Sequence, residues 1–240
     1  MAKLTADDFA RAVASALGAR LVTLLLYGSV ARGAHVPGRS DVNTLLLCDG
    51  VDDDVFARLE APVRAWSRAG HPAPLILTER EWREAADVFP IEYQDIRDAH
   101  RILAGRDPWT GIVIQHDDLR RQLEHELMGK LMHLRQAYAA HRSEPKRLAE
   151  VIVGSASGFL TMLRAALRLA GKPAPAAPDA LIREAADVVG FPAAELAPLV
   201  AHASGGPALK VAKHDPLPAA YLEAVARTAQ FVNRMERTHS

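Results

Sequence analysis

The sequence of 240 residues has a single cysteine, few aromatic side chains and no excess of either charge. Because a disulfide needs two cysteines, Cys48 cannot form one within the chain, and its place at the end of an apolar run favours a buried thiol over a nucleophile. Lysine plus arginine equals aspartate plus glutamate at 29 each, so no net charge draws the chain to polyanions. We therefore expect no general binding of nucleic acid.

Long hydrophobic runs are also missing from the sequence. The longest apolar stretches extend for about seven residues, whereas a helix that crosses a bilayer needs about 20. The opening residues, MAKLTADDFARA, carry acidic side chains and lack the apolar segment of a secretion signal. These features predict a soluble cytoplasmic protein with no membrane partner. The 49% of hydrophobic residues suffices for the core of one large or two small domains.

Most of the first half divides into short segments with a strand-like or a helical period. Thr5 followed three residues later by Asp8 forms a capping box, which marks the start of an amphipathic helix. The acidic run at 52–54 fits the N-cap and first turn of another helix better than a metal site. Residues 89–103 fit neither period cleanly, and we interpret them as one or two strands. We expect helices at 4–18, 52–69 (with Gly70 as its C-cap) and 79–86, and strands at 21–27, 42–47 and 74–78.

The pattern changes to long helices after Gly105. Leucines recur every three or four residues from 119 to 134, and a second long helix follows Pro145. A proline- and alanine-rich linker and further helices complete the chain. Long antiparallel helices joined by short loops form bundles. The sequence therefore predicts an α/β domain with a mixed sheet at 1–112 and an all-α helical bundle domain at 113–240.

The polar residues with the clearest chemistry lie between the first two predicted strands. Gly28 and Ser29 directly follow a buried strand and are expected to open a short helix, where backbone N–H groups and a hydroxyl could hold a phosphate. Asp41 and Asn43 are two residues apart, so on a strand they would share one face. Two carboxylates placed there would hold divalent ions around a triphosphate, but Asn43 provides only a neutral amide.

Two motifs in this stretch resemble the signature of the polymerase-β-type nucleotidyltransferase superfamily. The sequence GSVARG at 28–33 matches G-S-x-A-R-G, and SDVN at 40–43 matches S-D-x-D except at its last position. The resemblance covers about residues 20–105. It implies a small mixed-sheet palm domain, a nucleoside triphosphate bound through the Gly-Ser turn, and Mg²⁺ or Mn²⁺ held by the Asp-x-Asp pair with a third carboxylate. The helical half is similar in layout to the bundles of aminoglycoside nucleotidyltransferases and to the HEPN-type partners of minimal nucleotidyltransferases.

The chain departs from this family pattern in two places. Asn43 replaces the second metal-binding aspartate. The predicted strand at 74–78, which by position would carry the third carboxylate, has no acid. Glu92 is the substitute candidate, with Asp95 behind it. Arg32 could reach a phosphate or could instead anchor its loop through an ion pair with Asp41 or through a backbone carbonyl.

The leading hypothesis is transfer of a nucleoside monophosphate from a triphosphate to a hydroxyl of a small molecule or protein, weakened by the missing charge. The alternative is an inactive member that binds a nucleotide or a partner protein. A third hypothesis, a ribonuclease-like helical half, depends on Arg234 and His239, which match the Arg-x4-His pattern of HEPN ribonucleases. The expected partners are a nucleoside triphosphate, an acceptor and a second copy of the chain. The expected residues are Asp41, Asn43 and Glu92 in catalysis, Asp41 and Asn43 at the metal, and Gly28, Ser29 and Arg32 at the nucleotide.

Overall fold

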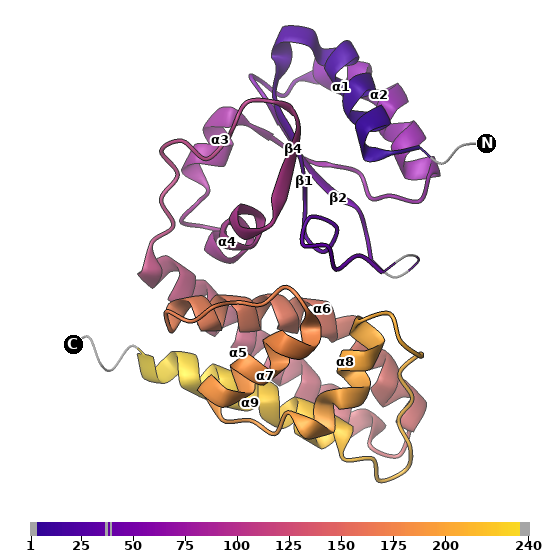
Figure 1. The fold of residues 1–240 in the computed structure, drawn as a ribbon, viewed down its shortest axis with the longest axis vertical. Helices are drawn as coiled ribbons and strands as arrows, with labels where there is room; N and C mark the ends of the chain where they lie inside the picture. The colour runs from indigo at the N-terminus through magenta and orange to yellow at the C-terminus, as the bar shows by residue number, and fades with distance from the viewer. Residues whose placement is uncertain (1–3, 37, 39, 236–240) are drawn as a thin grey trace. The chain divides into compact units, whose positions relative to one another are not determined.

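The computed structural model describes residues 4–36, 38 and 40–235, and the chain divides into two compact units, Met1–Ile114 and Gln115–Ser240. Figure 1 shows a sheet flanked by helices in the first unit and only helices in the second. The first unit contains α1 (Ala6–Leu17), η1 (Gly18–Arg20), β1 (Leu21–Tyr27), β2 (Asn43–Cys48), α2 (Asp53–Arg68), β3 (Leu75–Thr78), α3 (Glu79–Glu84), α4 (Pro90–Asp98) and β4 (His100–Gly105).

The sheet has the strand order β3-β2-β1-β4, with β1 antiparallel to both of its neighbours and β2 parallel to β3. At one end of β1, Tyr27 is paired with Asn43 on β2 and with His100 on β4. This register places the Gly-Ser turn that follows β1 beside the start of β2. The mixed α/β fold predicted for this half of the chain is confirmed.

Both faces of the sheet are buried, which explains why β1 and β2 are continuous aliphatic runs. Leu24 of β1 faces α1 and α2, where the rings of Phe9 and Trp66 stack at 4.6 Å between centroids. Leu25, the next residue, faces the opposite core under α3 and α4. Figure 1 shows these two helix pairs on opposite sides of the sheet. Successive side chains of β1 therefore pack into two separate cores, one on each face of the sheet.

The two helix N-caps predicted from sequence are present, but the predicted C-cap is wrong by one residue. Thr5 caps α1 in a reciprocal capping box with Asp8. Asp52 caps α2 by accepting a hydrogen bond from the N–H of Val55 at 2.9 Å. The C-cap of α2 is Ala69 and not Gly70, which follows it with a φ of +89°. The acidic start of α2 is thus structural.

The prediction of strands across 89–103 is wrong in its first part. Residues 90–98 form the helix α4, and only the end of the segment joins the sheet as β4. Pro90 suits the first position of a helix. The ring of Tyr93 stacks on Trp82 at 4.0 Å, and its hydroxyl donates to the Trp82 carbonyl oxygen at 2.6 Å. These contacts with α3 join residues 11 positions apart and stabilise α4. The short apolar pattern of 89–103 does not predict them.

The second unit is a bundle in which α5, α6 and α9 pack together. By length and composition, α6 could cross a membrane, with a mean hydropathy of 1.3 over its most apolar window. Half of that window is buried in the structure, and the core helix of a soluble protein can meet the same criteria of length and composition. The helices are α5 (His116–His141), α6 (Pro145–Leu169), α7 (Pro178–Val189), η2 (Ala194–Leu196), α8 (Ala197–Ala203) and α9 (Leu217–Met235).

Candidate functional site

The Gly-Ser turn directly follows β1, and Gly28 lies against Asn43. Gly28 has a φ of +81°, and a Cβ atom built on it would lie 3.3 Å from Nδ2 of Asn43. Only glycine combines this conformation with such a close approach at low energy. The pairing of Tyr27 with Asn43 sets this geometry. The structure therefore brings together two of the residues selected from the sequence, one from each motif.

Two details of the predicted site are wrong. Residues 28–33 form turns and no helix. The Arg32 N–H donates to the Gly28 carbonyl oxygen at 3.1 Å, as in one turn of an α-helix. This helical pattern does not continue beyond Gly33, whose φ is +71°. In addition, β2 begins at Asn43, so the exposed Asp41 precedes the strand. Asp41 and Asn43 therefore do not share a face of β2, contrary to the prediction from sequence. An anion bound after β1 would contact a turn and not the N-terminus of a helix.

Arg32 binds Asp95 of α4. Its guanidinium forms an ion pair with the Asp95 carboxylate and donates to the Asp95 backbone carbonyl at 3.1 Å. The Arg32 side chain is only 8% exposed and that of Asp95 17%. The predicted anchoring of Arg32 through a backbone carbonyl is therefore present. Its ion pair is with Asp95 and not with Asp41. This pair ties the turn after β1 to α4.

Asp95 and Glu92, the two acids of α4 selected from the sequence, act electrostatically on the end of β1. Burial, and then the negative charges of Asp95 and Glu92, raise the pKa of the Tyr27 hydroxyl. Both carboxylates are therefore within electrostatic reach of the residue that precedes Gly28. Glu92 itself is exposed and lies on a helix, not on the strand expected for it. Sequence reasoning missed Tyr27 as part of this group, since it resembles any other residue of a buried strand.

His100, which pairs with Tyr27 from the other side, was also missed. Trp109 donates its indole N–H to Nε2 of His100 at 3.1 Å, and Nδ1 of His100 lies 3.0 Å from the Ile96 carbonyl oxygen. An indole nitrogen only donates, so Nε2 must accept and the proton of this neutral ring must reside on Nδ1. Arg97 lies over the Trp109 ring at 5.0 Å. These contacts attach the end of α4 to β4, and no sequence motif marks them.

Among the described residues, no group of three or more His, Cys, Asp and Glu side chains is placed to hold a metal ion. The Asp41 carboxylate and the Asn43 amide could contribute oxygen ligands. In nucleotide sites Mg²⁺ is bound by one or two carboxylates together with phosphate oxygens and water. This donor set therefore fits one ion that arrives on a triphosphate, but does not fit a pair of ions held by the protein. Of the ribonuclease pair, Arg234 lies near the end of α9 and His239 falls outside the described residues.

The structure is similar to a crystal structure of the spectinomycin adenyltransferase AAD(9) from Enterococcus faecialis with ATP and spectinomycin. The TM-score is 0.57 at 13% sequence identity, and the similarity covers 92% of this chain and 97% of that one. No protein-family model matches the sequence. No curated protein matches it either. The chain thus has the fold of a nucleotidyltransferase, an α/β domain followed by a helical part.

Proposed function

We propose that this protein binds a nucleoside triphosphate at the end of β1 and transfers its nucleoside monophosphate to a hydroxyl of a small molecule or protein. The observation that carries the proposal is the contact of Gly28 with Asn43, which joins the two nucleotidyltransferase motifs at one end of the sheet. The similarity along 92% of the chain to an enzyme whose structure holds ATP and a small molecule supports the same choice.

In this proposal Gly28 and Ser29 contact the phosphates, since the turn offers backbone groups and a hydroxyl without a side chain in the way. Asp41 and Asn43 would contribute oxygens to Mg²⁺ or Mn²⁺, and the bound metal would neutralise phosphate charge. Glu92 is the proposed third carboxylate, a choice supported by the effect of its charge on Tyr27 at the same strand end. Phosphoryl transfer demands mostly positioning and charge stabilisation from the protein. Arg32 acts on the shape of the turn through Asp95, in place of the direct phosphate contact considered for it.

Asn43 makes transfer slow in this proposal. An amide oxygen carries no net charge, so the metal loses one unit of opposing charge a few ångströms away. At an effective dielectric constant of 20, two unit charges about 4 Å apart interact by about 4 kcal/mol. A loss of even half that amount would weaken the metal site by more than tenfold, since each 1.4 kcal/mol changes an equilibrium constant by about a factor of ten.

A second candidate is nucleotide binding without transfer. It is favoured by the lack, among residues 4–36, 38 and 40–235, of three acidic or other metal-binding side chains grouped for a metal ion. In this case the protein would act as a nucleotide-responsive or protein-binding module. The two candidates share the turn after β1 and differ only in chemistry at Asp41 and Asn43.

Substitution at position 43 separates the candidates. Calorimetry with ATP, GTP, CTP and UTP, with Mg²⁺ or Mn²⁺ and without metal, first measures binding to the natural chain. We then compare Asn43→Asp with the natural chain and with Asp41→Asn in nucleotide transfer, supplying hydroxyl acceptors and testing the protein as its own acceptor.

The enzyme proposal expects slow metal-dependent transfer by the natural chain, at least about tenfold faster transfer by Asn43→Asp, and none by Asp41→Asn. Transfer by Asn43→Asp alone would establish the binding module. Failure of all four nucleotides to bind the natural chain would contradict both candidates.

A further inference from the structure

The helical unit contains a groove that plays no part in the proposed nucleotide site. It is a cavity of about 660 Å³ where the end of α5, the start of α6 and the loop before α9 meet, and we call it the α5–α9 groove. Ligand pockets for small molecules span roughly 300–1,000 Å³. Its lining includes Tyr138, Arg142, Leu148, Lys213, His214 and Asp215.

Part of the α5–α9 groove is apolar. Tyr138, Leu148 and Pro218 line it, and the same three side chains line an adjoining hollow of about 20 Å³ that leads toward Tyr221. The Tyr221 ring packs edge-on against Phe159 in the core of the unit. An aromatic or aliphatic group lying on this part would remove apolar surface from water, worth about 25 cal/mol per Å².

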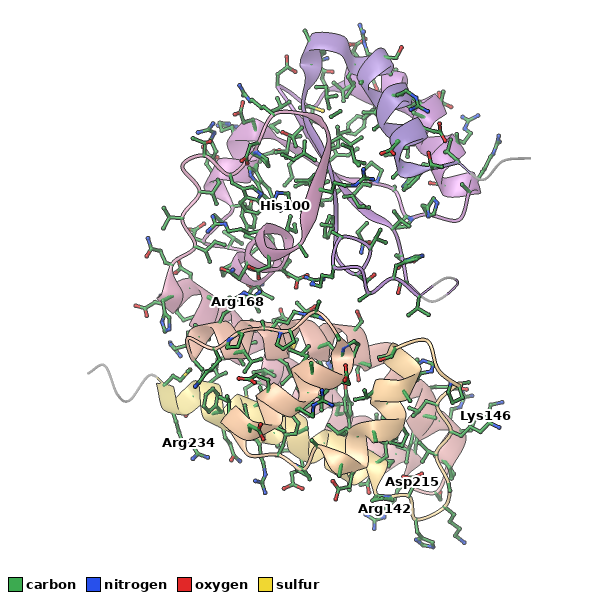
Figure 2. All side chains as sticks on the ribbon, viewed as in Figure 1. His100, Arg142, Lys146, Arg168, Asp215 and Arg234 are labelled. Atoms are coloured by element: carbon green, nitrogen blue, oxygen red, sulfur yellow. The ribbon has the colours of Figure 1, made fainter. Side chains whose placement is uncertain are left out.

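The lining of the α5–α9 groove also includes basic side chains. Arg142 and Lys213 both line it, and Asp215 is the one acidic residue among its described lining residues. The Asp215 carboxylate accepts hydrogen bonds from the backbone N–H groups of Ala212 at 3.2 Å and Leu217 at 3.0 Å. These two bonds hold the carboxylate against the loop before α9, and its single negative charge is outnumbered by the positive charges of Arg142 and Lys213. Figure 2 shows Arg142 and Asp215 at the same end of the helical unit.

The loop that carries Lys213 is held in an uncommon conformation. His214 has a φ of +66°, and it is the one residue other than glycine with positive φ in the described chain. Such a conformation costs about 1–2 kcal/mol for a residue with a Cβ atom. The Asp215 hydrogen bonds on both sides of this position supply the constraint. The backbone of this part of the groove is therefore constrained before a ligand binds, which reduces the entropy lost on binding.

From this combination we propose that the α5–α9 groove binds a small organic anion with an aromatic or aliphatic body. The carboxylate, sulfonate or phosphate group of the ligand pairs with Arg142 and Lys213, and its body lies on Tyr138 and Leu148. The Arg142 guanidinium, 5.7 Å from the Tyr138 ring centre, joins the charged and apolar parts of the site. This site does not depend on nucleotide binding at β1.

A pair of fluorescent probes tests the proposal on the full chain. Anilinonaphthalene sulfonate is an aromatic anion, and N-phenyl-1-naphthylamine is its neutral counterpart. The double variant Arg142→Gln, Lys213→Gln removes both cations of the groove. The matched control is Arg135→Gln, Arg147→Gln, which removes one exposed cation from each of α5 and α6 outside the groove. Thermal unfolding followed by circular dichroism verifies that every variant is folded.

The natural chain should bind the anionic probe, and the groove variant should bind it about tenfold more weakly, the combined effect of two partly exposed charge interactions. The neutral probe should bind both proteins within twofold, and the control variant should behave as the natural chain. Equal affinity of the groove variant for the anionic probe, an equal loss in the control, or no binding by the folded natural chain would overturn the proposal.

Discussion

The two ends of strand β1 each have an arginine that binds aspartate, and they differ in how far water reaches them. At the start, Arg20 donates to Asp49, Asp52 and Asp54 at 2.9–3.2 Å, and the side chains of these aspartates are 54–57% exposed. At the other end, Arg32 binds one aspartate and both side chains are largely buried. Solvent and salt screen the first cluster strongly and the second pair much less.

At the two ends of β1, a cluster of acidic residues does not mark the candidate functional site. The carboxylate-rich end of β1 is structural, since Asp52 caps α2 and its neighbours bind Arg20. The other end, with the Gly-Ser turn and Asn43, is the candidate nucleotide site, although its arginine binds one aspartate and not three. A search for clustered aspartates would select the wrong end of the strand. What distinguishes the candidate site is backbone geometry at Gly28.

The sharpest test of the comparison is removal of each arginine. Arg32→Gln leaves the Asp95 carboxylate without its buried counter-charge, and such changes destabilise proteins by about 3–5 kcal/mol. Arg20→Gln should lower the free energy of unfolding by about 1 kcal/mol or less. Urea unfolding followed by tryptophan fluorescence measures both, because all three tryptophans, Trp66, Trp82 and Trp109, lie in the first unit.

The double variant Arg32→Met, Asp95→Leu is the control for this test. Replacing a buried ion pair by apolar side chains is often neutral or stabilising, so it should recover most of the loss caused by Arg32→Gln. Equal effects of Arg32→Gln and Arg20→Gln would contradict the difference between the two ends of β1.

A smaller effect is expected from alanine at the turn. Gly28→Ala adds a side chain at a φ of +81° and within 3.3 Å of the Asn43 amide, and it should cost about 2 kcal/mol in unfolding free energy. Gly33→Ala has a similar φ of +71° but no atom within 4 Å of the added Cβ, so its loss should be the backbone part alone, about 1 kcal/mol. Nucleotide affinity measured by calorimetry should fall further in Gly28→Ala. Matching effects of the two variants on stability and affinity would indicate that the Asn43 contact is unimportant.

The smallest effect concerns acid titration at the exposed cluster. Hydrogen bonds from Arg20, followed by the Val55 N–H, lower the pKa of Asp52 to about 2, from an ordinary value near 3.9. Because the folded pKa is depressed, the stabilising contribution is present above about pH 4 and is lost as the pH falls through about 2. Carboxyl chemical shifts followed by NMR should show this midpoint, and it should rise toward the ordinary value in Arg20→Gln. If the Asp52 pKa is the same in Arg20→Gln as in the natural chain, Arg20 is not the main cause of the lowered pKa.

Local sequence patterns predicted the elements whose causes are local. The capping box at Thr5, the aliphatic strands and the long amphipathic helices were all found, because each leaves a periodic or short-range signal. The helix α4 was missed since Tyr93 is fixed by Trp82, a contact decided by tertiary packing. The same limitation applies at the site. The motif residues Gly28 and Asn43 could be selected, but the partnership of Arg32 with Asp95, 63 residues away, could not.

The buried thiol gives this chain a practical property. Burial, with a smaller contribution from the Asp49 charge, raises the pKa of Cys48 to about 11, so almost no reactive thiolate exists near neutral pH. Toward maleimides and iodoacetamides the folded protein should behave as one that has no cysteine. A cysteine introduced beside the Gly-Ser turn or the α5–α9 groove would then carry a spectroscopic label with little background. Ligand binding at each location could be followed separately in an otherwise unaltered chain.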